Sequence, residues 1–241
     1  MSHFNFTLPN VRKCFVPDTG YEICDCDLAQ ADARVVAWEA EDDILKEIFR
    51  DPSRDLHSEN AKALGVSRDL AKRAVHAINY TISAPALSRS VGVTVHDAER
   101  FIYRWFSVHP GIKDWHRRCE ANLLNSRTIT NKFGYKRVYF DRVEQLLGEA
   151  VAWIPQSTVA LIITKAMIKA EEKYPNLIQP LLQVHDSFIV QYRVEDRDKA
   201  LLAMKDCMHI SVPYPDPLII PSEPATSTIS WGDVKKTSWP K

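Results

Sequence analysis

Ile23-Cys24-Asp25-Cys26-Asp27-Leu28-Ala29-Gln30 places an aspartate at the point where an apolar strand meets its turn. A second segment, far along the chain, has the same character and reads Leu181-Leu182-Gln183-Val184-His185-Asp186-Ser187-Phe188-Ile189-Val190. Short apolar runs bounded by turn residues are typical of buried strands. We therefore predict a strand over residues 21–27 and a hairpin over residues 181–192 that turns at His185 and Asp186.

Asp27 and Asp186 are candidate ligands for a divalent metal ion. Mg²⁺ prefers hard oxygen ligands, usually one or two carboxylates completed by water and substrate phosphate. Two such ions can stabilise both the attacking and the leaving oxygen of a phosphoryl displacement. Two alternatives stay open at this point. Asp27 could be the N-cap of the following helix, and Asp25, which shares its strand face, could be the ligand instead.

Between the two segments, polar side chains recur every four residues at Arg68, Lys72, His76 and Tyr80. In a helix this spacing keeps them on one stripe, and the helix N-terminus near Arg68 favours an anion. The pattern could hold a nucleoside triphosphate, although an ordinary solvated helix face looks the same. Glycine is scarce at 7 residues, and the glycine-rich phosphate-binding motifs are absent. Side chains and metal would therefore have to hold any triphosphate.

Composition is that of a soluble globular protein, with 45% hydrophobic and 26% charged residues among 241. By inspection no stretch approaches the roughly 18 apolar residues of a membrane span. Five cysteines without a C-x-x-C pair indicate a reducing cytosol and no zinc site. Zero net charge argues weakly against nucleic-acid binding. Residues 100–142, however, carry ten Lys and Arg against three Asp and Glu, a net +7 interleaved with aromatic residues. This segment is either a phosphate-tracking surface or a solvated helix face.

The order of elements predicts an α+β fold in which a block of helices interrupts an antiparallel sheet. The expected helices cover residues 30–50, 56–64, 68–83, 95–108, 111–125, 149–174 and 196–210. A strand pair is expected over 128–140, and a last strand over 228–231. Pro155, near the first turns of the long helix, indicates a kink or a late start.

These segments resemble the motifs of family A DNA polymerases. Asp27-Leu-Ala-Gln30-Ala-Asp32-Ala-Arg34 resembles their first catalytic motif, D-x-S-Q-x-E-x-R. The pattern from Arg68 to Tyr80 resembles the second, R-x-x-x-K-x-x-x-[FY]-x-x-x-Y-G, and Gln183-Val-His-Asp186 resembles the third, x-V-H-D-E. Further similarities are Asp55-Leu-His57 to D-I-H, Pro155-Gln-Ser-Thr158 to a Q-G-T segment, and Trp231-Gly-Asp-Val-Lys235 to the usual carboxyl end. Order and spacing agree over nearly the whole chain.

The resemblance implies a palm built from residues 1–38 and 145–241, with helical fingers inserted over 39–144. The implied reaction is template-directed transfer of a nucleotide from a dNTP to a primer 3′-hydroxyl, with primer–template DNA as partner. Asp27 and Asp186 would bind two Mg²⁺ ions and, with Lys72, serve catalysis. The implied nucleotide-binding residues are Arg68, Lys72, His57, His76, Tyr80, Gln30 and Asp32. The implied DNA-binding residues are Gln156, His185, Lys136 and Arg137.

Five positions depart from the family pattern, among them Ala152, which falls where an asparagine is often seen. Asp32 stands where the family has a glutamate that excludes the ribose 2′-hydroxyl, and His76 replaces a Phe or Tyr that packs on the nucleotide. Thr81 replaces a glycine, and Ser187 replaces an acid after the third-motif aspartate. None of these changes removes a metal ligand, so they put nucleotide selection rather than chemistry in question.

The interval from His57 to Arg68 is short and resembles the bacteriophage branch more than bacterial DNA polymerase I. We expect a cytoplasmic location in a bacterial or phage-infected host and no membrane association. No thumb or proofreading exonuclease is found ahead of Met1. That leads us to expect a truncated or partner-dependent core, with a separate chain left open as the source of the thumb or of processivity. Two other hypotheses stay open: a non-catalytic fragment of a split polymerase that binds nucleotide and DNA, and a metal-dependent nuclease, which would leave the Arg68–Tyr80 pattern without a purpose.

Overall fold

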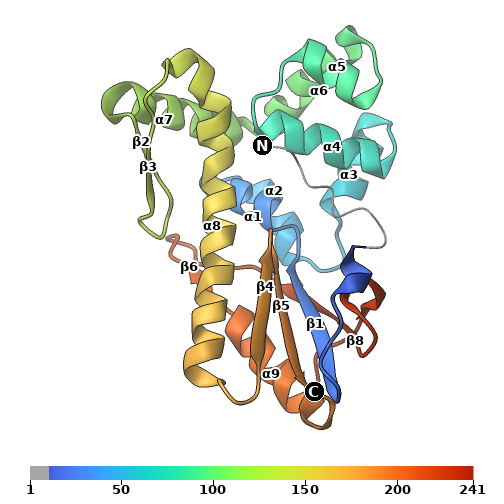
Figure 1. The fold of residues 1–241 in the computed structure, drawn as a ribbon. Helices are drawn as coiled ribbons and strands as arrows, with labels where there is room; N and C mark the ends of the chain where they lie inside the picture. The colour runs from blue at the N-terminus through green and yellow to red at the C-terminus, as the bar shows by residue number, and fades with distance from the viewer. Residues whose placement is uncertain (1–10, 241) are drawn as a thin grey trace. The chain divides into compact units, whose positions relative to one another are not determined.

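The computed structural model describes residues 11–240, which divide into two compact units (Figure 1). One unit contains the described residues up to Ala31 together with those from Val159 onward. The other contains Asp32–Thr158. Residues 1–10, which belong to the expected palm, lie outside the described residues. The names palm and fingers, with their boundaries at 38/39 and 144/145, stay a prediction.

An antiparallel five-stranded sheet forms the centre of the first unit, with the strand order β4-β5-β1-β8-β9. Its strands are β1 (Tyr21–Leu28), β4 (Gln179–Val184), β5 (Ser187–Arg193), β8 (Ser222–Ser227) and β9 (Lys235–Lys236). Figure 1 shows β4, β5, β1 and β8 side by side. The expected first strand and hairpin are confirmed, and so is the α+β class.

The two faces of β1 have different surroundings because side chains alternate along a strand. Cys24, Cys26 and Leu28 are all at most 1% exposed. They belong to the face on which α9 (Arg197–Met208) packs against β5 and β8. Asp25 and Asp27 belong to the opposite face. The alternation therefore separates an apolar core from a carboxylate-bearing surface on the same strand.

The long helix α8 runs over Val143–Lys173 and contains Pro155 in its interior, so it begins earlier than expected. The hydroxyls of Ser157 and Thr158 donate to the Ile154 carbonyl at 3.1 and 2.8 Å beside the proline. Over Leu146–Lys173 the helix is long and apolar enough to cross a membrane by length and composition, which the sequence reading had missed. More than half of its most apolar stretch is buried within the protein, as in the core helix of a globular domain.

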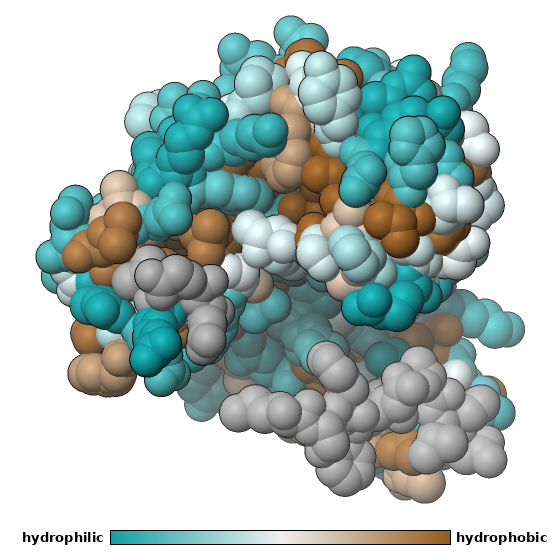
Figure 2. Space-filling model, turned by 90° about the horizontal axis from the view of Figure 1, so that it is seen from above, coloured by the Kyte–Doolittle hydropathy of each residue, from teal (hydrophilic) through white to brown (hydrophobic). Residues whose placement is uncertain are grey.

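Helices dominate the second unit, together with a small hairpin. They are α1 (Ala31–Glu39), whose first residue belongs to the other unit, α2 (Asp43–Arg50), α3 (Leu56–Leu64), α4 (Arg68–Asn79), α5 (Ala84–Val91), α6 (Val95–Val108) and α7 (Pro110–Ser126). The hairpin consists of β2 (Thr128–Thr130) and β3 (Lys136–Val138), as expected. On the face seen in Figure 2, hydrophobic side chains lie in separate patches among hydrophilic ones, which is usual for a folded domain.

A single helix over residues 30–50 is a wrong prediction, because the chain breaks between α1 and α2. Glu41 adopts a left-handed conformation with φ of 53°. Asp42 then caps α2 by accepting from the Leu45 amide at 2.9 Å, and it also contacts the buried His109 ring at 2.8 Å. Capping and a tertiary contact at Asp42 therefore outweigh the continuous helical pattern of the sequence.

The expected strand over residues 228–231 is also wrong. The chain there turns, with the Ser227 hydroxyl accepting from the Ile229 and Ser230 amides, and Trp231 begins a short 3₁₀ helix, η3 (Trp231–Asp233). The strand lies earlier, at β8. The other short elements are η1 (Arg12–Cys14), η2 (Val194–Asp196), β6 (Ser211–Val212) and β7 (Leu218–Ile219).

The backbone of Thr81 is strained, at the position where the second motif of the family has a glycine. Its φ is 65°, and the amides of Thr81 and Ile82 bond back to the carbonyls of Ile78 and Ala77, so it occupies the left-handed position that ends α4. A β-branched residue is disfavoured there. Thr81→Gly should raise the free energy of unfolding by about 0.5–1 kcal/mol, since relief of strain exceeds the entropy that glycine adds to the unfolded chain. Chemical denaturation measures this change.

Gly65 offers the matched control. It ends α3 with φ of 69°, and a Cβ added there would meet no atom within 4 Å. Gly65→Thr should destabilise the protein by about 1–2 kcal/mol through backbone strain alone. A loss of stability in Thr81→Gly as large as that in Gly65→Thr would show that Thr81 is not under strain.

Candidate active site

Asp27 and Asp186 lie together at one end of the sheet in the first unit. Asp27 is paired in register with Ser187 of β5, and the Leu28 amide donates to the Asp186 carbonyl at 3.1 Å. Both aspartates line a cavity of about 300 Å³. Asp27 cannot be the N-cap of α1, because it is a paired strand residue four positions before that helix begins. The capping alternative for Asp27 is therefore wrong.

The turn between β4 and β5 fixes the direction of Asp186. Only His185 and Asp186 separate the two strands, and His185 takes a left-handed φ of 53°, which suits a two-residue hairpin turn. The next residue, Ser187, donates its hydroxyl to Asp27 Oδ1 at 3.0 Å. Ser187 thus supports Asp27 from the position at which the third motif of the family has an acid.

Electrostatic repulsion within this cavity suits a cation. Burial, and next the charge of Asp186, raise the pKa of Asp27 to about 6. The Ser187 hydrogen bond opposes this shift. Among the side chains that the structure describes, no cluster of three or more His, Cys, Asp or Glu could hold a metal ion by itself. Two carboxylates that repel each other and face a cavity are nevertheless a donor set that fits Mg²⁺ completed by water and phosphate.

A thermal measurement tests the raised pKa of Asp27 without any assay of activity. An ionised Asp27 is disfavoured in the fold, so its proton stabilises the native state below pH 4, and that stability is lost as the pH rises through about 6. In EDTA, Asp27→Asn should therefore gain stability over wild type between pH 4 and 7. The gain should reach about 1 kcal/mol, allowing for solvent screening of this exposed group.

Asp198→Asn is the control for the removal of one negative charge, because Asp198 is exposed on α9 away from the cavity. Its difference from wild type should not follow the same pH course. Mg²⁺ should then raise the Tm of wild type and of Asp198→Asn but not that of Asp27→Asn. A stability difference for Asp27→Asn that stays constant from pH 4 to 7 would contradict the shifted pKa.

Asp25 is engaged elsewhere, which counts against it as the metal ligand. Its Oδ2 accepts from the Trp231 indole N–H at 2.7 Å and lies 3.9 Å from a guanidinium nitrogen of Arg12. Asp25 is 8% exposed, whereas a larger part of Asp27 is exposed and the rest of it is buried. Of the two aspartates on this strand face, Asp27 is therefore the one available to a cation.

The second unit contains the polar stripe predicted from the sequence. Arg68, Lys72 and His76 are exposed along α4, while the opposite side of the helix is buried through residues such as Ala71, Val75 and Ile78. The His76 and Tyr80 rings pack edge to face with centroids 4.8 Å apart. Ser67 caps the helix by accepting from the Leu70 amide. The sequence spacing thus places Arg68, Lys72 and His76 on one exposed stripe, whereas Tyr80 ends the helix and is half-buried.

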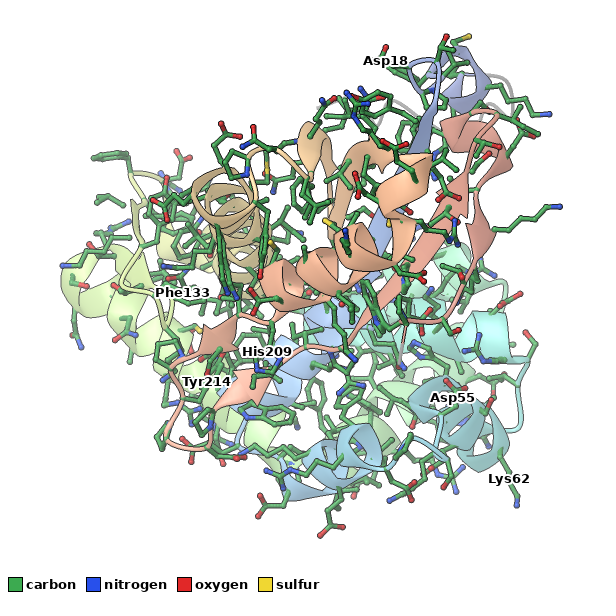
Figure 3. The ribbon with its side chains drawn as sticks, turned by 90° about the horizontal axis from the view of Figure 1, so that it is seen from below. Asp18, Asp55, Lys62, Phe133, His209 and Tyr214 are labelled. Atoms are coloured by element: carbon green, nitrogen blue, oxygen red, sulfur yellow. The ribbon has the colours of Figure 1, made fainter. Side chains whose placement is uncertain are left out.

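Asp55 holds the first residue of this stripe. It caps α3, at whose start it is labelled in Figure 3, by accepting from the Ser58 amide at 2.8 Å. Its two oxygens also accept from the Arg68 guanidinium at 2.9 and 3.1 Å. This pairing with Arg68 holds the pKa of Asp55 well below its usual range. Lys62, on the same helix, extends outward in Figure 3 and does not join the stripe.

His57 is the buried member of this group, at 7% exposure. Its Nδ1 is buried and has no hydrogen-bond partner within the part of the chain that the structure describes. Burial lowers the pKa of His57, and the nearby charges of Lys72 and Arg68 lower it further. His57 is therefore a buried imidazole with one unbonded nitrogen, near the charges of Lys72 and Arg68.

Asp32 and Tyr80 are joined directly. The Tyr80 hydroxyl donates to Asp32 Oδ2 at 3.1 Å, which connects the first turn of α1 to the end of α4. Burial, followed by the Asp32 charge, raises the pKa of Tyr80 well above its ordinary value. Gln30 precedes α1 with φ of 52°, and its Oε1 is buried without a hydrogen-bond partner among residues 11–240.

The four residues expected to contact DNA do not form one group within a single unit. Gln156, Lys136 and Arg137 are exposed in the second unit, whereas His185 lies in the turn of the first. The Arg137 guanidinium forms an ion pair with Glu149. Asn131 ties the hairpin to α8 through the Ser157 hydroxyl at 3.0 Å.

Sequence reasoning gave no site role to several residues that line the aspartate cavity. They are Arg12, Glu223, Ala225, Trp231 and Lys236. Val184 and Ser187 also line the cavity and were named only as positions of the third motif or next to it. Glu223 is the cross-strand partner of Asp27 on β8, and Lys236 of β9 forms an ion pair with Glu223. Their placement depends on strand order, for which the sequence carries no local signal. Trp231 was recognised only as part of a terminal motif.

Comparisons with known proteins agree with this geometry. Residues 6–224 match the family model of DNA polymerase family A. The thermostable DNA polymerase I of Thermus filiformis is 30% identical over 228 residues, which cover 86% of this chain and 27% of the relative. The DNA polymerase I of Pseudomonas aeruginosa is 26% identical over 234 residues, covering 87% of this chain and 25% of the relative.

One solved structure also resembles the chain. It is the POL domain of Pol1 from M. smegmatis in complex with DNA primer-template and dNTP, with a TM-score of 0.81 and 22% sequence identity. The match covers 94% of this chain and 43% of that one. The chain therefore has the fold of part of that domain, and it spans about a quarter of the length of the curated relatives it matches.

Proposed function

This chain belongs to DNA polymerase family A, and from that membership we propose that it carries the nucleotidyl-transfer centre of a template-directed DNA polymerase. The proposed reaction joins a primer 3′-hydroxyl to the α-phosphate of a dNTP and releases pyrophosphate. The observation that carries the proposal is the pairing of Asp27 with Asp186 at one cavity, where burial and mutual repulsion raise the pKa of Asp27. Primer–template DNA and dNTPs are the proposed partners. The proposed location is the cytoplasm of a bacterial or phage-infected cell.

Asp27 and Asp186 would hold the catalytic Mg²⁺, two ions in the full proposal. Bound divalent cations would supply charge stabilisation for the attacking and leaving oxygens. The chain's own contribution is positional. The sheet register sets Asp27, the two-residue turn sets Asp186, and the Ser187 hydroxyl holds one oxygen of Asp27.

The stripe on α4 would bind the triphosphate. Arg68 and Lys72 offer positive charge on one exposed face, and His57 offers the buried nitrogen beside them. Asp55 orients the Arg68 guanidinium, which leaves the unbonded part of this planar group for phosphate. Lys72 has the more flexible ammonium, and we propose it as the residue that neutralises charge on the leaving pyrophosphate.

Sugar and base would lie toward the far end of the stripe, near His76, Tyr80 and Asp32, and Gln30 would also contact the nucleotide. DNA would contact Gln156, His185, Lys136 and Arg137. Lys136 and Gln156 are exposed and suited to such contacts. Arg137 would have to exchange or share its ion pair with Glu149. The two-domain assignment, with a palm that holds the aspartates and fingers that hold the stripe, belongs to the same proposal.

Primer extension by the full chain tests the proposal. A labelled primer annealed to a longer template is incubated with Mg²⁺ and all four dNTPs, and its length is followed. Template-dictated extension supports the polymerase. Binding of DNA and dNTP without extension would instead indicate a non-catalytic fragment or one that needs a further chain for a thumb. Shortening of the primer without dNTP would indicate a nuclease.

A further inference from the structure

Asp25 poses a problem for the proposed metal site, because it is a second carboxylate on the same face of β1. Residues two apart on a strand project in the same direction, so Asp25 and Asp27 both border the cavity. An additional free carboxylate there could compete for the cation and would add to the repulsion. In the structure, one oxygen of the Asp25 carboxylate is instead engaged by Trp231.

The Asp25 carboxylate has a single hydrogen bond from the described residues. Oδ2 accepts from Trp231 Nε1 at 2.7 Å, while Oδ1 is buried with no partner among residues 11–240. Arg12, at 3.9 Å, adds an opposite charge. Without the indole N–H the carboxylate would be buried with no donor at all, which is costly enough to make the side chain turn toward the cavity.

Trp231 is held firmly for this task. It is 1% exposed, its amide donates to the Phe15 carbonyl at 2.8 Å, and its indole packs edge to face with the Phe15 ring. The Arg12 guanidinium lies over the indole, 4.4 Å from the ring centroid. Arg12 thus contacts both the carboxylate and the residue that donates to it.

Gly232 makes the close contact with η1 possible. A Cβ at Gly232 would lie 2.9 Å from the Lys13 backbone nitrogen and 2.5 Å from its Cγ, so any side chain there would push η1 away. Lys13 also pairs with Asp233 at 3.7 Å. Segments from the two ends of the described chain are thereby fixed to each other beside β1.

We propose that Trp231 and Arg12 sequester the Asp25 carboxylate, so that of the three aspartates that line the cavity only Asp27 and Asp186 are presented to a divalent cation. Trp231 and Arg12 are then positioning residues: they act on the metal site through Asp25. This inference rests on the proposed function, since it concerns the metal site of that reaction. Its central consequence is that a defect caused by loss of Trp231 should depend on the presence of the Asp25 charge.

The test uses the full chain and Mn²⁺ as the probe, with binding followed by electron paramagnetic resonance. Trp231→Phe keeps an aromatic ring but removes the donor. It should raise Mn²⁺ affinity by about 10–100-fold, because the released Asp25 carboxylate competes for the cation. It should lower kcat for primer extension by a similar factor, with KM for dNTP little changed. In the Trp231→Phe/Asp25→Asn double variant, Mn²⁺ affinity and kcat should return to those of Asp25→Asn alone. A merely structural role of Trp231 would not be rescued by changing Asp25.

Trp239→Phe is the matched control, since Trp239 also donates its indole N–H to the sheet unit, at 3.1 Å to the Ser222 carbonyl, but does not line the cavity. It should leave Mn²⁺ affinity unchanged. If Trp231→Phe does not fold, Arg12→Met replaces it, with a smaller shift in the same direction and the same rescue by Asp25→Asn.

The outcomes separate this inference from the proposed function. The expected Mn²⁺ pattern, with neither primer extension nor binding of DNA and dNTP by wild type, would support the sequestration of Asp25 and overturn the polymerase. Extension by wild type, with Mn²⁺ affinity unaltered in Trp231→Phe or not restored by Asp25→Asn, would overturn the sequestration and leave the polymerase. Absence of Mn²⁺ binding by wild type would overturn the sequestration as well.

Discussion

Primer extension should fall by at least about 100-fold when either Asp27 or Asp186 is replaced by asparagine, more than is typical for residues that only support a metal ligand. The amide is nearly isosteric but carries no charge, so it cannot offset the charge of a divalent cation. Both aspartates line one cavity, and the Asp186 charge helps to raise the pKa of Asp27. Single-nucleotide incorporation under enzyme excess measures the effect on chemistry directly.

Folding should survive both substitutions, because each removes repulsion from a cavity without metal. The Ser187 hydroxyl can still donate to the amide oxygen of an asparagine at position 27. Asp198→Asn again controls for charge, and it should extend primers like wild type. Activity within tenfold of wild type in Asp27→Asn or in Asp186→Asn, with the protein folded, would remove that residue from the proposed metal site.

The elements that carry the aspartates could be predicted from the sequence because their signals are local. The apolar run of β1 and the two-residue turn at His185 and Asp186 are set by neighbouring residues alone. The exposed stripe on α4 follows likewise from four-residue spacing within one helix. Of the candidate residues named from these signals, Asp27 and Asp186 line one cavity, and Arg68, Lys72 and His76 are exposed.

Strand order and cross-strand neighbours could not be predicted in this way. β8 lies beside β1 although nearly 200 residues separate them, and this register brings Glu223 opposite Asp27. The contact of Trp231 with Asp25 spans 206 positions. Such contacts depend on how the whole sheet assembles. For the same reason Asp25 and Asp27 look equivalent in the sequence, and only the tertiary structure separates them.

Local rules also failed where a tertiary contact competes with them. The helical pattern over residues 30–50 continues through Glu41, yet the chain breaks there because Asp42 both caps α2 and contacts His109. Thr81 shows the reverse case, since a residue unsuited to the left-handed conformation is held in it at the end of α4. In both places the sequence reports a preference that the assembled fold overrides.

Asp32→Glu should increase the preference for dNTP over rNTP by at least about 10-fold, measured as the ratio of the two kcat/KM values, because one methylene in a tight pocket is typically worth 1–3 kcal/mol. In the proposed site this carboxylate borders the sugar. Its Oδ2 is fixed by the Tyr80 hydroxyl at 3.1 Å, so a longer side chain at the same place would have to fill additional space. That space is where a 2′-hydroxyl would lie if Asp32 is the sugar gate.

Two further variants separate sugar exclusion from other effects of the same change. Asp69→Glu makes the identical substitution on an exposed residue in the first turn of α4, and it should leave the ratio unchanged. Tyr80→Phe keeps the ring but releases Asp32, so it should weaken whatever discrimination wild type has. If Asp32→Glu leaves the dNTP-to-rNTP ratio at the wild-type value while the enzyme remains active, Asp32 does not border the sugar. The alignment of the first motif beyond Gln30 would then be wrong.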